Sequence, residues 1–174
     1  MNLRPLGFLD TSRLSASYTL VTSKEAVDSR DHYHHGVRTL WLRQEGEDAE
    51  ILTRDKPWKA AKAFLTKLRN EAAPFFGGTV PALGDVAIRS IVPQGRIDWH
   101  AEHGPEHARI REVHICLTPS PGAWLYCGGE GMVLNVGHLV YLNRMAMHSE
   151  VNFGPVTMTK LVAELIVPET VVEE

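Results

Sequence analysis

Three side chains near the middle and end of the chain have the types and spacing of a metal site. His100 and Glu102 are two residues apart, so in an extended segment both project from the same face. His148 follows much later, after the apolar run GHLVYLN and a short loop. Two imidazoles and one carboxylate can hold ferrous iron on one side and leave the other coordination positions open. The sequence therefore predicts a metal site formed by His100, Glu102 and His148.

Other histidines give alternatives to this set. His103 and His107 follow His100, but their spacing does not place them with it on one extended face, so we expect them at the rim of the site. A second cluster, in SRDHYHHG, is polar and turn-like, and we expect either a solvated loop or substrate contacts there. Its members are His32, His34 and His35.

Composition excludes several classes of partner. A formal net charge of -3 and a pI near 6.3 provide no basic face for nucleic acid or anionic lipid. Apolar runs fall short of the about 18 residues that suggest a membrane span, and the first residues do not resemble a signal peptide.

Cys116 and Cys127 lie in apolar runs, where cysteine usually acts as a small buried residue. We expect one domain, located in the cytoplasm.

Most of the chain is predicted to be β-structure. One helix is expected at 57–72, where Pro57 stands at the first helical position and apolar residues recur at helical spacing. Gly and Pro turns separate the other segments, which are rich in β-formers. The expected extended segments are 15–23, 37–43, 49–54, 86–93, 109–118, 123–127, 131–143 and 156–167.

These elements predict a fold class. Many short strands after one or two N-terminal helices favour a double-stranded β-helix, a cupin-like jelly roll, over a parallel α/β sheet. We expect residues 1–74 to supply N-terminal strands and a supporting helix, and residues 75–169 to form the metal-binding core. Facing strands of a jelly roll are far apart in sequence, which lets His100 and His148 meet.

Four segments carry a resemblance to a known family. They are IVPQGRIDWH at 91–100, VHICL at 113–117, NVGHLVYLNRMAMHSEVN at 135–152 and KLVAELIVPE at 160–169. In order and spacing they resemble the aspartyl/asparaginyl β-hydroxylases, a family of iron- and 2-oxoglutarate-dependent oxygenases. The resemblance implies that His100 and His148 bind the metal and that His114 contacts the co-substrate.

The chain departs from that family at both arginines that would bind 2-oxoglutarate. The matching positions are Met158 and Glu112. Lys160 lies on the same strand face as Met158 and offers a point charge, whereas Arg89, on a neighbouring predicted strand, offers a bidentate fork. We expect these two cations to replace the missing clamp. Further candidates are Arg109, Arg111 and Arg144.

The resemblance implies an Fe(II)- and 2-oxoglutarate-dependent dioxygenase. It would hydroxylate an unactivated C–H bond of an amino acid, a peptide side chain or a small metabolite, with no catalytic residue beyond the metal ligands. One alternative is a cupin-like metal-binding protein, because Asn152 follows His148 at a cupin-like spacing. Another is a degenerate family member that binds no 2-oxoglutarate.

Overall fold

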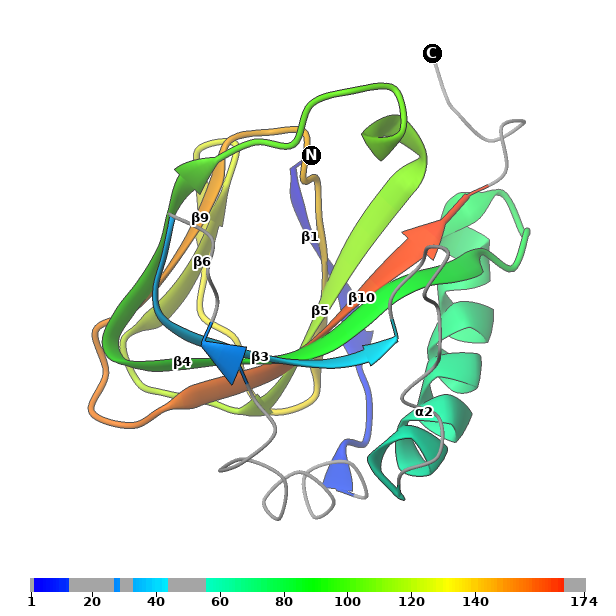
Figure 1. Cartoon of the computed structure of the whole chain (residues 1–174). Coiled ribbons are helices and arrows are strands. Elements are labelled where there is room, and N and C mark those ends of the chain that lie inside the picture. The colour runs from blue at the N-terminus through cyan, green and yellow to red at the C-terminus, as the bar shows by residue number, and fades with distance from the viewer. Residues whose placement is uncertain (1, 13–26, 29–32, 44–55, 168–174) are drawn as a thin grey trace.

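The computed structural model describes residues 2–12, 27–28, 33–43 and 56–167. Within these residues, ten antiparallel strands curl into a nearly closed barrel with the order β1-β8-β5-β10-β4-β9-β6-β7, and β3 also pairs with β4 and β2 (Figure 1). This arrangement is a double-stranded β-helix, so the predicted fold class is confirmed. The strands are β1 (Leu3–Phe8), β2 (Val27–Asp28), β3 (His34–Arg43), β4 (Ala82–His100), β5 (Ile110–Thr118), β6 (Ala123–Cys127), β7 (Glu130–Met132), β8 (His138–Leu142), β9 (His148–Asn152) and β10 (Met158–Ile166).

Strand β4 connects the two walls of the barrel. Its first half pairs with β10, from Ala82 to Ile91, and its last residues pair with β9, from Arg96 to His100. Between these halves the strand bends at Pro93 and Gln94, where Gln94 adopts a positive φ of 63°. Proline cannot donate a ladder hydrogen bond, so pairing is interrupted there. The bend carries His100 away from the helix-covered wall and onto the opposite one.

The chain packs closely at this bend. Gly36 of β3 has a positive φ of 64°, and a Cβ there would lie 2.8 Å from the Val92 side chain, so both conformation and space favour glycine opposite the bend. The Asn152 side chain donates hydrogen bonds of 2.8 Å to the carbonyls of Ile91 and Val156. Because Asn152 is fully buried, these bonds also satisfy its amide. Its spacing from His148 therefore has a structural explanation in the strand bend.

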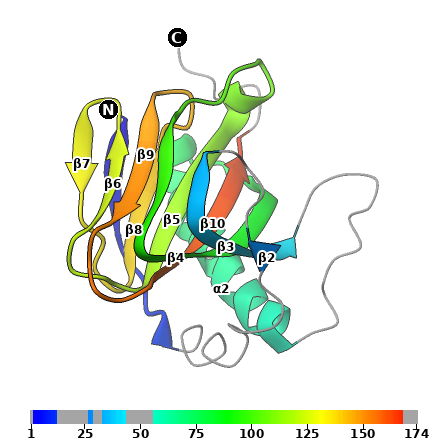
Figure 2. The same cartoon turned by 60° about the vertical axis from the view of Figure 1, so that its left-hand side comes forward.

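Helix α2 (Lys56–Ala72) covers one outer face of the barrel (Figure 2). Leu65 and Leu68 are almost fully buried and belong to one apolar cluster with residues of β4, β5 and β10. Burial of a leucine contributes about 1.5–3 kcal/mol. The helix predicted at 57–72 is confirmed, and a short 3-10 helix (Ala73–Phe76) follows it.

Two smaller apolar clusters also lie among the described residues. One contains both cysteines, which are free and buried as expected. Burial is the main reason that the pKa of each thiol is raised to about 11. The other contains Met158, Ile91 and Ile97, so the position matching the family arginine holds a buried core residue.

The structure corrects several predicted boundaries. Segment 131–143 forms two strands, β7 and β8, because a turn with Gly137 at φ 75° separates them. His148 begins a strand that was not among the expected segments, β9, which precedes the last long strand, β10. His34 and His35 are part of β3 and not of a turn, since they pair with Ile97 and Arg96 of β4.

One strand was missed, and some predicted segments cannot be compared with the structure. Strand β1 was not predicted, and it pairs with β8. The segments expected at 15–23 and 49–54, and His32, lie outside the described residues. Among the residues described, no helix is both long enough and apolar enough to cross a lipid bilayer.

Candidate metal centre and its cavity

The two predicted histidines meet directly. His100 is the last residue of β4 and His148 the first of β9, and they are register partners with ring centroids 4.1 Å apart. Their Nδ1 atoms donate to backbone carbonyls, His100 to Asp98 at 2.8 Å and His148 to Ala146 at 2.9 Å. This fixes the tautomer and leaves each Nε2 lone pair available to a metal.

The surroundings keep His148 neutral. Burial lowers the pKa of His148, and the nearby His100 lowers it further, although the bond to the Ala146 carbonyl acts in the opposite direction. Neutral imidazole is the form that binds metals. The ring of Tyr33 stacks on His100 with centroids 4.4 Å apart, which holds the imidazole in place.

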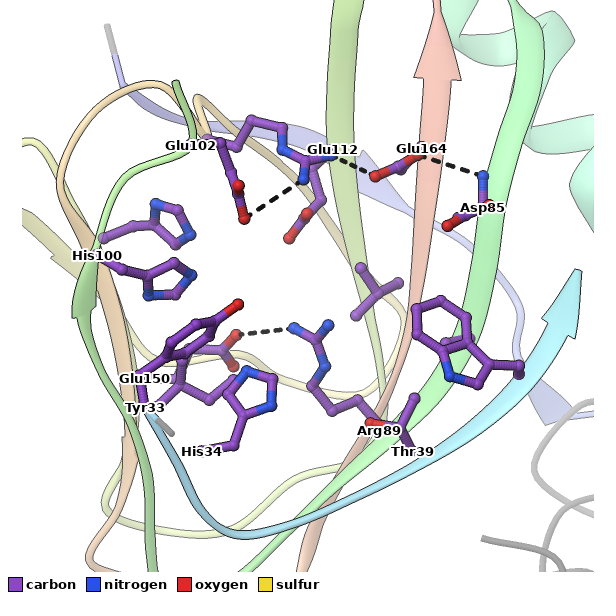
Figure 3. A pocket seen from close by; sticks show the side chains of 16 residues that line it. Tyr33, His34, Thr39, Asp85, Arg89, His100, Glu102, Glu112, Glu150 and Glu164 are labelled. Atoms are coloured by element: carbon purple, nitrogen blue, oxygen red, sulfur yellow. Dashed lines mark hydrogen bonds and ion pairs between the residues drawn. The ribbon is translucent and has the colours of Figure 1, made fainter. Parts of the chain in front are cut away.

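The carboxylate of Glu102 lies in the same cavity but turns toward Arg144. The Arg144 Nη2 is 3.4 Å from Glu102 Oε1, and the Glu102 amide donates to the Arg144 carbonyl at 2.9 Å. The other end of the guanidinium pairs with Glu164 (Figure 3). Within the described residues, no three His, Cys, Asp or Glu side chains converge as a complete ligand set. The structure thus brings the two histidines together and leaves Glu102 in an ion pair beside them.

Arg89 extends into the cavity from β4. Its Nη1 is 4.0 Å from Glu150 Oε1, and its buried Nε has no hydrogen-bond partner. Figure 3 shows the guanidinium beside Glu150, with His100 across the cavity. A buried donor without a partner is costly, so this atom has unused capacity for an anionic ligand.

Lys160 and His114 lie behind the cavity wall. Both are completely buried, and Lys160 Nζ is 2.8 Å from His114 Nδ1. Lys160 also forms an ion pair with Glu150. His114 Nε2 lies 2.5 Å from Glu112 Oε1. A continuous polar chain therefore runs from Glu112 through His114 and Lys160 to Glu150.

The two carboxylates that end this chain are ionised. Burial opposes ionisation of Glu112, but the bond from His114 and the charges of Arg89 and Arg144 outweigh it and hold its pKa well below the usual value. Burial likewise opposes ionisation of Glu150, whereas Lys160, His114 and Arg89 lower its pKa. Burial of an ionised carboxylate costs much free energy unless the carboxylate is paired with cations or hydrogen-bond donors.

The cavity enclosed by these residues has a volume of about 400 Å³. Four of the six residues predicted for the site line it, namely His100, Glu102, His148 and Arg89, whereas His114 and Lys160 do not. The full lining is Tyr33, His34, Thr39, Trp41, Asp85, Ala87, Arg89, Ile97, His100, Glu102, Glu112, Arg144, His148, Glu150, Val162 and Glu164.

The remaining candidates have other contacts. Arg109 and Arg111 donate to the carbonyls of Val167 and Ala108, at 3.1 and 2.6 Å, and neither lines the cavity. His103 is exposed. His107 Nε2 lies 3.4 Å from Glu106 and 4.0 Å from Glu102, which places it beside the site.

Sequence reasoning missed Glu150. It stands two residues after His148 on the same strand, so strand periodicity alone directs both side chains to one face. This is the same signal that pairs Glu102 with His100. It was available in the sequence, but only the neighbouring strands show that Glu150 faces Lys160.

The fold matches solved structures of oxygenases. No protein-family model matches the sequence, and no curated protein matches it. A Pseudomonas putida prolyl-4-hydroxylase is similar with a TM-score of 0.67 and 15% identity, covering 96% of this chain and 93% of that one. The viral collagen prolyl hydroxylase from Paramecium Bursaria Chlorella virus-1, in its 2OG complex, has a TM-score of 0.64 and 9% identity, with 97% of each chain covered. HygX from Streptomyces hygroscopicus, with nickel and 2-oxoglutarate bound, has a TM-score of 0.65 and 11% identity, covering 96% and 82%. These similarities establish the shared fold.

Proposed function

We propose that this protein is an Fe(II)- and 2-oxoglutarate-dependent dioxygenase. The observation that carries the proposal is the His100–His148 pair, whose Nδ1 atoms are both bonded to carbonyls and whose Nε2 atoms are left for a metal. The pair lines a cavity in a fold shared with HygX, which was solved with nickel and 2-oxoglutarate bound. Neutral imidazoles and a carboxylate suit ferrous iron.

The residues present fit both groups. His100 and His148 would hold the iron, and Glu102 would become the third ligand after leaving Arg144. The free Nε of Arg89 and its position in the cavity suit the distal carboxylate of 2-oxoglutarate. When bound, iron and 2-oxoglutarate would supply an oxidation by dioxygen, in which one oxygen atom enters the co-substrate as it loses carbon dioxide and becomes succinate, and the other hydroxylates the substrate carbon.

The chain's own residues then have defined tasks. The carbonyls of Asp98 and Ala146 keep both imidazole rings oriented. Tyr33 packs against His100 and shields one side of the site. Arg89 sets the orientation of the co-substrate. Positioning of the reacting C–H bond is the protein's main contribution to such chemistry.

The size of the cavity limits the substrate. A space of about 400 Å³ must hold the co-substrate and the reacting part of the substrate. We therefore propose an amino acid, a single peptide side chain or a small metabolite. The motif order at 91–100 and 135–152 favours a relative of the aspartyl/asparaginyl β-hydroxylases.

A second candidate is a metal-binding protein of this fold that does not use 2-oxoglutarate. It is favoured by the ion pair of Lys160 with Glu150, because Lys160 is one of the two candidate ligands for the 2-oxoglutarate carboxylate and is already paired. It is also favoured by the pairing of Glu102 with Arg144. Metal uptake without co-substrate binding would identify it.

Anaerobic addition of Fe(II) and 2-oxoglutarate tests the proposal. We expect a weak visible charge-transfer absorption that is lost in His148→Ala, because one of two converging imidazoles is removed. His138→Ala is the matched control, since His138 begins β8, stacks on Phe8 and does not line the cavity. Absence of the absorption in the unmodified protein, with metal still bound, would favour the second candidate.

A further inference from the structure

Two cations in the barrel face one internal carboxylate. Lys160 of β10 and Arg89 of β4 are register partners on adjacent strands. Glu150 reaches them from β9, with Oε2 paired to Lys160 and Oε1 at 4.0 Å from Arg89 Nη1. Both side chains that the sequence offers as carboxylate ligands are thus directed at a carboxylate that belongs to the protein.

Burial makes these charges strongly coupled. The side chains of Lys160 and Glu150 are 0% and 3% exposed, and that of Arg89 is 16% exposed. Water screens such a group of charges poorly, so a change of one charge is felt by the others. His114 Nδ1 lies 2.8 Å from Lys160 Nζ and 4.0 Å from Glu150 Oε1, so it contacts the ammonium close to the Glu150 carboxylate.

The three groups differ in their access to a ligand. Arg89 and Glu150 line the cavity, whereas Lys160 does not. Arg89 also retains a buried Nε without a partner. Glu150 pairs with Lys160, and Arg89 is the cation of this group that reaches the cavity, where the ionised Glu112 is a second nearby carboxylate.

We infer that Glu150 is a resident competitor for the distal carboxylate of the co-substrate, and that it limits the affinity of the site for dicarboxylates. This inference rests on the proposed function and names a residue that sets co-substrate selection. Arg89 binds the carboxylate, Lys160 serves only to hold Glu150, and the negative charge of Glu150 beside Arg89 weakens binding.

Calorimetric titration of the nickel-loaded full chain with 2-oxoglutarate tests the charge argument. Glu150→Gln leaves Lys160 and Arg89 without the resident anion, and we expect 2-oxoglutarate to bind about tenfold or more tightly. The double variant E150Q/K160M restores the original balance, and we expect an affinity within about threefold of the unmodified protein. Circular dichroism verifies that each variant is folded.

A second titration makes the test independent of small losses of active protein. The probe is 2-oxoglutaramate, in which an amide replaces the distal carboxylate. The ratio of its dissociation constant to that of 2-oxoglutarate should rise about tenfold in Glu150→Gln, because only the charged ligand gains from removal of Glu150. His148→Ala, which lacks a metal ligand, reports loss of the metal site separately.

The outcomes separate the two proposals. Unchanged affinity in folded Glu150→Gln, with metal still bound, overturns the inference and leaves the dioxygenase proposal intact. If Glu150→Gln does not fold, the double variant decides, since a loss of more than about tenfold there identifies Lys160 as the carboxylate ligand and overturns the inference. Binding only after Glu150 is replaced supports it. No binding in any variant overturns both.

Discussion

The wall formed by β4, β10 and β5 has two faces of opposite character. Toward α2, alternate residues such as Val86, Val113 and Leu161 are fully buried and apolar. Toward the barrel interior, the residues between them include Arg89, Glu112 and Lys160. The same strands therefore build a core on one side and a charged cavity on the other, because successive side chains point to opposite faces.

The neighbours Lys160 and Leu161 illustrate what this alternation achieves. Both are 0% exposed, yet Leu161 needs only an apolar surface, whereas Lys160 needs Glu150 and His114 as partners. Packing against α2 tolerates other apolar residues of similar volume. The interior face tolerates a charge only with a partner of opposite sign. The outer face thus stabilises the fold, whereas the inner face carries the charged groups of the proposed binding site.

The largest effect should come from breaking the interior ion pair. Lys160→Met leaves Glu150 buried with only Arg89 and His114, each 4.0 Å from its Oε1, and we expect a loss of about 4 kcal/mol in the free energy of unfolding. Urea denaturation measures it. The double variant K160M/E150Q should be more stable than Lys160→Met alone, because it removes both charges. If it is less stable, the inner face does not depend on charge pairing.

A smaller loss is expected on the helix-covered face. Leu161→Ala opens a cavity beside α2 and should lower the free energy of unfolding by about 3 kcal/mol. Leu161→Met, which nearly conserves volume, should cost less than about 1.5 kcal/mol. Nickel and 2-oxoglutarate affinities of the folded variants should match the unmodified protein. A tenfold change in either would show that the two faces are not independent.

Substitution of Arg89 should change the free energy of unfolding least and should still weaken the binding of 2-oxoglutarate clearly. Arg89→Met removes the cation that faces the cavity, and 2-oxoglutarate should bind about tenfold more weakly, equivalent to about 1.4 kcal/mol. The affinity for nickel should equal that of the unmodified protein, since Arg89 is not one of the proposed metal ligands. Arg38→Met is the matched control, because Arg38 is exposed on β3. Equal effects of both substitutions would contradict the assignment of Arg89.

Local patterns predicted many elements correctly. Period-2 alternation and Gly and Pro turns identified β3, β5, β6 and β10, and helical spacing identified α2. Strand β1 was missed because its residues, LRPLGF, contain Pro and Gly and do not alternate clearly. Its place in the sheet depends on pairing with β8, which is a long-range contact that no local window contains.

The sequence by itself determined the strand-rich class, the helix, and the residue types that suit a metal: two histidines and a carboxylate two residues from the first. Only the tertiary structure decided that His100 and His148 are register partners, that Glu102 turns to Arg144, and that Lys160 faces Glu150. The reason is physical. Periodicity sets the face of a strand on which a side chain lies, whereas its partner depends on which distant strand is paired beside it.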